Sequence, residues 1–111
     1  MFLKLFLVAI SLVSLVSGRF ACGRDEMTSK FNENMVEKGC PELIRGFDEC
    51  CLRHGRCYDF KEKKREECDA TFCQCLNNQA KKNKGCNFAA ENLCNNAKAW
   101  GFLHYPIIGR K

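Results

Sequence analysis

Ten cysteines in a chain of 111 residues constrain the fold more than any other feature of the sequence. All ten follow an N-terminal stretch, residues 1–18, that has one charge at Lys4, an apolar run, and the small residues Ser17 and Gly18 at its end. This layout is typical of a secretory signal peptide, so we expect one disulfide-rich domain over residues 19–111. The expected localisation is secreted and extracellular, where ten thiols oxidise to five disulfides.

The size of this domain limits the class of protein. A chain this short cannot bury a large core, and disulfides supply stability that packing cannot. Cytosolic enzymes, Rossmann folds and intracellular zinc fingers are therefore poor candidates. No second apolar stretch approaches the roughly 20 residues of a membrane-spanning helix. The formal net charge of +5 suits an anionic surface without specifying one.

Hydrophobic periodicity predicts an all-α fold. Residues 42–60 and 66–80 are predicted as two long helices joined by the charged turn KEKKRE, and residues 88–100 as a third. The first long helix could begin near Pro41 or near Asp48, since both residue types favour helix starts. No stretch alternates with period two, so we expect little or no sheet. A shorter helix is expected before Gly39, with its apolar face carrying Phe31, Met35 and Val36.

The spacing of four cysteines gives the geometry of the two long helices. Cys50 and Cys57 are seven residues apart, as are Cys68 and Cys75, and seven residues make two helical turns. Antiparallel helices would then join Cys50 to Cys75 and Cys57 to Cys68. The crossed pairing needs parallel helices, which the short turn excludes. We therefore predict a small disulfide-rich domain built on an antiparallel two-helix core.

His54 lies between these two cross-links and faces the partner helix. In the antiparallel register His54 is level with residue 71, and Asp69 is two residues away, about 3 Å along the axis. An imidazole–carboxylate hydrogen bond can span that offset, and it would fix His54 as a base of defined tautomer. The alternative is a structural pair that only satisfies a buried imidazole.

These residues resemble the motifs of a known family. The segment Cys50–Tyr58, CCLRHGRCY, resembles the active-site helix of secreted phospholipases A2, whose motif is Cys-Cys-x-x-His-Asp-x-Cys, often followed by Tyr. Cys68-Asp69, with Cys75 six residues after Asp69, resembles the second motif of that family. The match covers residues 48–76, and the compact format is similar to small invertebrate members.

The resemblance implies roles and disulfides. His54 would be the general base that activates a water, Asp69 would orient it, and Tyr58 would support Asp69. The resemblance also implies the two cross-links above and, from the bee-venom-type branch, Cys22–Cys51. The sequence does not decide how the other four cysteines pair, and we favour Cys40–Cys73 and Cys86–Cys94.

One departure from the family motif affects a residue that binds calcium in that family. The family has Asp, a calcium ligand, directly after the catalytic His, and this chain has Gly55 there. The family's Gly-rich calcium loop is half retained in the segment from Cys22 to Asp25, where Arg24 adds a positive charge. We therefore expect no cofactor; calcium enters only if another oxygen ligand substitutes, the candidates being Asp25, Glu26 and Asp59.

These observations leave three functions open. The favoured one is a phospholipase A2-like protein with weak or no activity that binds phospholipid, a membrane surface or a protein receptor. The others are an active phospholipase A2 cleaving the sn-2 ester, and a non-enzymatic disulfide-rich effector. We expect a monomer and no nucleic-acid partner. Two basic clusters and an apolar tail suit an anionic lipid surface. The first cluster is Lys61, Lys63, Lys64 and Arg65, and the second is Lys81, Lys82 and Lys84. The apolar tail contains Trp100, Phe102, Leu103, Tyr105, Ile107 and Ile108.

Each of these features also has a simpler interpretation. The basic run at 61–65 can be a solvated turn, and Trp100 can be part of the core or its cover. The spacing Cys51-x-x-His54-x-x-Cys57 could bind zinc, although an oxidising compartment argues against free thiolates.

Overall fold

The computed structural model describes residues 20–23, 25–103 and 105. The predicted signal peptide over residues 1–18, Arg24, and the apolar tail residues Ile107 and Ile108 lie outside these described residues. The described chain forms four α-helices and three short 3-10 helices, with no strand, which confirms the all-α prediction: α2 (Glu26–Gly39), η1 (Pro41–Leu43), α3 (Ile44–Asp59), α4 (Arg65–Ala80), η2 (Lys84–Cys86), α5 (Asn87–Trp100) and η3 (Gly101–Leu103).

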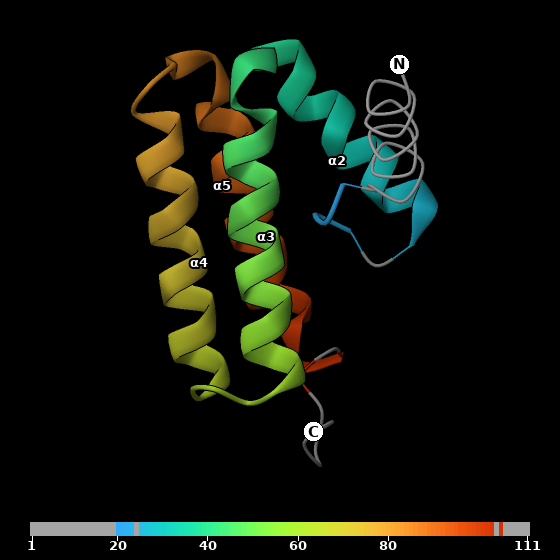
Figure 1. Ribbon diagram of the computed structural model, residues 1–111, viewed down its shortest axis with the longest axis vertical. Coiled ribbons are helices and arrows are strands. Elements are labelled where there is room, and N and C mark those ends of the chain that lie inside the picture. The colour runs from blue at the N-terminus through green and yellow to red at the C-terminus, as the bar shows by residue number, and fades with distance from the viewer. Residues whose placement is uncertain (1–19, 24, 104, 106–111) are drawn as a thin grey trace, which may run out of the picture.

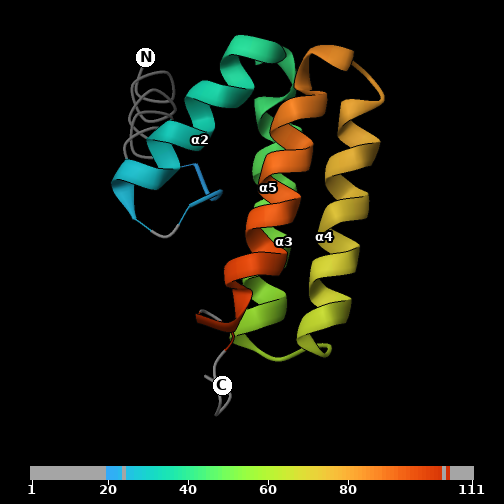
Figure 2. The same cartoon turned by 180° about the vertical axis from the view of Figure 1, so that it is seen from behind.

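The helices are arranged around the antiparallel pair of α3 and α4. Figure 1 shows these two helices side by side with α5 behind them, and Figure 2 shows α5 from the other side. The helix α4 packs against both α3 and α5, whereas α2 is inclined away from the three and contacts only α3 and α5 closely among the described α-helices. No helix in the described part of the chain is long and apolar enough to cross a membrane.

Local sequence explains where the helices begin. Asp25 caps α2, because its carboxylate accepts from the Thr28 backbone N–H at 2.8 Å and Thr28 Oγ1 accepts from the Asp25 N–H at 3.2 Å. Pro41 opens η1, which leads directly into α3. Asp48 does not begin a helix. Its carboxylate instead accepts from the Ala21 N–H at 2.6 Å and ties the N-terminal segment to α3.

The core lies where α3, α4 and α5 meet the C-terminal end of α2. Val36, Phe47 and Leu76 are fully buried in it, and seven of the ten cysteines are also buried there. Two of the apolar residues named from the sequence are exposed. Phe31 is 66% exposed although it shares a helix with buried Val36, and Trp100 is 56% exposed, so its interpretation as a core residue is wrong.

Three of the five disulfides pair as the sequence analysis predicted. Cys50–Cys75 and Cys57–Cys68 cross-link α3 to α4, with Cα–Cα distances of 5.7 and 5.9 Å. The third is Cys22–Cys51, the pairing that the family resemblance implied.

The favoured pairing of the other four cysteines was wrong, because the structure joins Cys40 to Cys86 and Cys73 to Cys94. Two residues along a helix turn through about 200°, so Cys73 points toward α5 whereas Cys75 points toward α3. The Cys40–Cys86 bridge forms where Gly39 and Gly85 bring two backbones together. A Cβ on either glycine would overlap the carbonyl oxygen of the other.

Candidate active site

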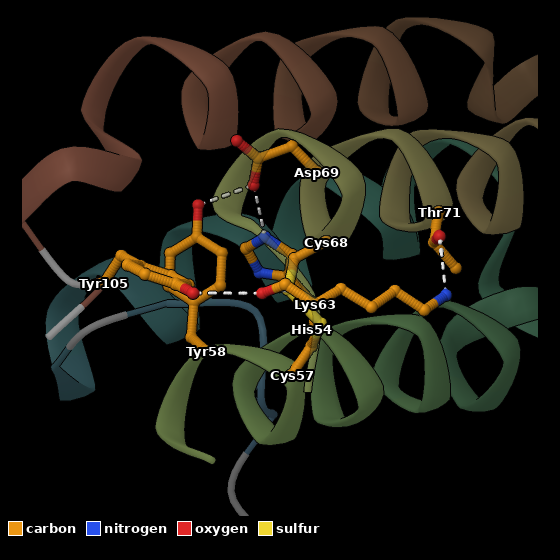
Figure 3. Close-up of a disulfide and its surroundings, with 8 residues drawn as sticks. All are labelled: His54, Cys57, Tyr58, Lys63, Cys68, Asp69, Thr71 and Tyr105. Carbon is orange, nitrogen blue, oxygen red and sulfur yellow. Dashed lines mark hydrogen bonds and ion pairs between the residues drawn. A yellow bond between two sulfur atoms is a disulfide. The ribbon is translucent and has the colours of Figure 1, made fainter. Parts of the chain in front are cut away.

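The side chains of His54 and Asp69 meet between the two cross-links of the helix pair. His54 Nε2 lies 2.8 Å from Asp69 Oδ1, so the contact expected from the antiparallel register is present. Figure 3 shows the imidazole of α3 pointing at the carboxylate of α4, next to the Cys57–Cys68 disulfide. Antiparallel helices cross-linked at two heights hold this pair in one register.

Tyr58 adds a second hydrogen bond to the same carboxylate oxygen. Its hydroxyl donates to Asp69 Oδ1 at 2.5 Å, and Tyr58 follows His54 by one helical turn on α3. Burial and the Asp69 carboxylate both raise the pKa of the Tyr58 phenol, so the hydroxyl stays protonated and remains a donor. Asp69 is 5% exposed and accepts from two donors that belong to one helix face.

Two aromatic rings hold the imidazole. Phe72 stacks on His54 with ring centroids 4.3 Å apart and an interplanar angle of 28°, and Tyr58 lies at the same centroid distance at 47°. Burial lowers the pKa of His54, and the hydrogen bond and charge of Asp69 oppose that shift only in part. His54 is therefore neutral at pH 7. If its Nε2–H donates to Asp69, Nδ1 is left as the ring's acceptor.

His54 forms part of the wall of a cavity of about 740 Å³ between the N-terminal segment, α2, α3 and α5. That volume lies within the usual range of ligand pockets, roughly 300–1,000 Å³. Apolar side chains line much of the cavity: Phe31, Phe72, Leu93, Ala97, Trp100 and Leu103. Besides His54, Tyr58, Asp59 and Thr28, three amide side chains add polar positions: Asn32, Asn92 and Asn96. Sequence reasoning missed the three asparagines, because no motif marks them.

Gly55 leaves an open position in this wall. A Cβ built on Gly55 meets no atom within 4 Å, so no neighbouring side chain has taken the space. An acidic side chain at this position would reach the cavity, and the chain provides none.

Several described oxygen atoms of the N-terminal segment beside this wall already accept hydrogen bonds within the chain. The Ala21 carbonyl accepts from the Gly23 N–H at 3.0 Å, and the Cys22 carbonyl accepts from Asn32 Nδ2 at 2.6 Å. Asp25 caps α2, and Asp59 lines the cavity one turn beyond Gly55. No three acidic, histidine or cysteine side chains among the described residues are grouped to hold a metal. Calcium takes six to eight oxygen ligands, so the described carboxylates of this wall would not complete such a site by themselves.

The zinc alternative at Cys51, His54 and Cys57 is wrong. Cys51 is bonded to Cys22, and Cys57 is bonded to Cys68, so neither sulfur is available as a thiolate.

The two basic clusters lie at opposite ends of the helix pair. Lys61, Lys63 and Lys64 belong to the connection from α3 to α4, and Lys81, Lys82 and Lys84 to the connection from α4 to α5. Figure 1 shows the first connection at the same end of the molecule as the C-terminal end of α5. Trp100 and Leu103, which line the cavity, are at that end.

Comparison with known proteins gives one informative relative. The chain is 33% identical over 89 residues to a protein of Caenorhabditis elegans named phospholipase A2-like protein. The alignment covers 79% of this chain and 51% of the relative, so the chain spans about half the length of the protein it matches. No family model matches the chain, and no solved structure does. The similarity supports the phospholipase A2-like family, in agreement with the motifs around His54 and Asp69.

Proposed function

We propose that this chain is a secreted phospholipase A2-like protein that binds lipid at the cavity beside His54 and has weak or no calcium-dependent hydrolytic activity. The observation that carries the proposal is the open position at Gly55, in the wall of a largely apolar cavity that retains the His54–Asp69 pair. A cavity of this kind keeps the space for an acyl chain while lacking the side chain that the family uses to bind its metal.

The lining and the exposed edge of the cavity support lipid binding. Each methylene that leaves water contributes about 0.8 kcal/mol, so part of one acyl chain supplies a substantial binding free energy. Trp100 and Leu103 are each more than half exposed at the lining, where a lipid would cover them. The basic residues of the α3–α4 connection lie at the same end, and they favour an anionic surface.

Hydrolysis would be limited by the lack of a group that stabilises the developing oxyanion. His54 can accept a proton from a water at Nδ1, and Asp69 and Tyr58 hold the ring for that step. Nothing in the described cavity supplies a cation to stabilise the oxyanion. Loss of a single such stabilising group costs about 10²–10³-fold in rate.

Vesicle binding tests the proposal, and Trp100 is its reporter because the chain has one tryptophan. The oxidised protein is titrated with vesicles of phosphatidylcholine and phosphatidylglycerol, in EDTA and in calcium. We expect a blue shift of Trp100 emission of equal size in both buffers. No shift with any vesicle would contradict lipid binding.

Two matched triple variants test whether one end of the molecule binds the vesicle or whether the total positive charge of the protein is enough for binding. Replacing Lys61, Lys63 and Lys64 by Gln removes three charges at the end that carries Trp100, and replacing Lys81, Lys82 and Lys84 removes three at the other end. At about 1 kcal/mol for each basic residue near an anionic surface, the first variant should weaken binding at least about tenfold. The second should change it less than about threefold.

The active-enzyme alternative is favoured by one observation, the intact His54–Asp69–Tyr58 cluster. Calcium-dependent release of fatty acid from the same vesicles would establish it. Leakage of vesicle contents without any lysolipid product would instead favour the non-enzymatic effector.

A further inference from the structure

Tyr105, which is distant from His54 in the sequence, packs against the Tyr58 ring of the His54 site. Its ring meets that of Tyr58 edge-on, with centroids 5.2 Å apart and an interplanar angle of 84°. Its hydroxyl donates to the Lys63 carbonyl at 3.0 Å, and its backbone N–H donates to the Gly101 carbonyl at 2.9 Å. Lys61 Nζ lies 5.4 Å from the ring centroid. Figure 3 shows Tyr105 against Tyr58 on the side away from His54.

Gly101 makes close contact with the same group. A Cβ built on Gly101 would overlap the Tyr58 hydroxyl and would come within 3.6 Å of Asp69 Oδ2. Gly101 has φ of −58°, which any residue can adopt, so glycine is needed here for space and not for backbone conformation. Together Gly101 and Tyr105 confine the Tyr58 side chain at its hydroxyl and at its ring.

We propose that Tyr105 is a positioning residue of the His54–Asp69 pair, acting by holding the Tyr58 hydroxyl on Asp69 Oδ1 in the space that Gly101 leaves. The inference rests on the proposed role of His54 as a base. It adds the C-terminal residues Gly101 and Tyr105 to a site whose other members come from α3 and α4. The α3–α4 pair places His54 and Asp69 together, and Tyr105 keeps Tyr58, the third residue of the cluster, in place.

The proposal predicts the direction in which the pKa of His54 changes when Tyr105 is replaced. The Tyr58 hydrogen bond takes part of the acceptor capacity of Asp69 Oδ1, so its loss makes the carboxylate a better partner for a protonated imidazole. Removing Tyr105 also admits water, which reduces the burial that lowers the pKa of His54. Both effects raise that pKa. Other charged groups surround this region. Arg65 and Glu66 act on Tyr58 from α4, Asp59 lines the cavity, and Lys61 lies over the Tyr105 ring. A second cavity beside His54 is lined by Arg53, Arg56, Glu62 and Lys63.

The test is an NMR pH titration of the His54 ring in the oxidised protein produced from the full chain. The chain has two histidines, and a His104→Gln variant assigns the two resonances. Tyr105→Ala should raise the His54 pKa toward its ordinary value of 6.5. Tyr105→Phe keeps the ring contact and loses the bond to Lys63, so it should give a smaller shift of the same sign. Gly101→Ala, which displaces the Tyr58 hydroxyl, should also raise the pKa.

The matched control is Phe102→Ala, which removes an exposed aromatic ring from the same 3-10 helix as Gly101 and should leave the His54 pKa unchanged. In a Tyr58→Phe background, Tyr105→Ala should lose most of its effect, because the bond it protects is already absent.

An unchanged His54 pKa in both Tyr105 variants, or an equal shift with and without the Tyr58 hydroxyl, would overturn the proposal. The titration needs neither lipid nor calcium, so its failure is distinguishable from a failure of lipid binding.

Discussion

At the scale of single residues, three glycines have different physical consequences. Gly55 lies in the interior of α3 with open space where its side chain would be. Gly39 lies against the backbone of Gly85, and Gly101 lies against the Tyr58 hydroxyl. The missing side chain leaves an unfilled position in the first case and permits a close contact in the other two.

Gly55→Ala should stabilise the protein by about 0.5–1 kcal/mol, since glycine in a helix interior costs about that much relative to alanine and the new Cβ meets nothing. The measurement is urea unfolding with the disulfides intact. Gly39→Ala is the matched control and should destabilise, because its Cβ would overlap the Gly85 carbonyl. A destabilised Gly55→Ala variant would mean that this position is not open.

Stability should depend on pH through His54. Its pKa is lowered in the folded state, so the unfolded chain binds the proton more readily as the pH falls. The stabilising contribution is fully present above pH 6.5 and is lost as the pH falls through the lower folded value. We expect the free energy of unfolding to decrease between pH 7.5 and pH 5. In His54→Gln that part of the decrease should disappear, and an identical pH profile in the variant would contradict the assignment.

Much of the site could be predicted at this scale, but not all of it. Helix geometry fixes the height of His54 relative to Asp69, so the contact follows from spacing alone. Gly101 and Tyr105 lie in a segment without periodicity, and no pattern relates them to Tyr58. A glycine directly after the third helix predicts a helix end, and the sequence contains no signal that it is also needed for space.

At the scale of elements, the antiparallel helix pair is the feature that the sequence specifies best. Two cysteine pairs with equal spacing allow one register, and both cross-links form as predicted. The pairing of the other four cysteines depends on how α2 and α5 pack against the pair. That packing is determined by buried apolar contacts and by the close approach of Gly39 to Gly85, neither of which appears in local sequence.

Peptide mapping without reduction tests the corrected disulfides. Cleavage after Lys and Arg, followed by cleavage after Glu91, separates Cys86 from Cys94. The peptide that contains Cys40 should then be joined to the one that contains Cys86, and the peptide that contains Cys94 to the one that contains Cys73. A Cys40–Cys73 species would show that α2 packs differently from the arrangement in Figure 1.

At the scale of the whole molecule, the cavity has a defined orientation. Its apolar lining residues Trp100 and Leu103 and the basic α3–α4 connection share one end of the molecule, and the second basic cluster lies at the other. Sequence reasoning found both clusters but could not place them relative to the cavity, because the cavity depends on how α2 and α5 pack against the helix pair. The structure makes the first cluster the better candidate for contact with lipid.

The central proposal is a lipid-binding protein that contains the His54–Asp69 pair and does not bind calcium. Calorimetric titration of the oxidised protein with calcium, with fatty-acid release from phospholipid vesicles assayed in the same buffer, tests it most directly. We predict no calcium binding and no calcium-dependent release, because Gly55 supplies no ligand and the Ala21 and Cys22 carbonyls already accept hydrogen bonds. Micromolar-to-millimolar calcium binding accompanied by turnover would contradict the account.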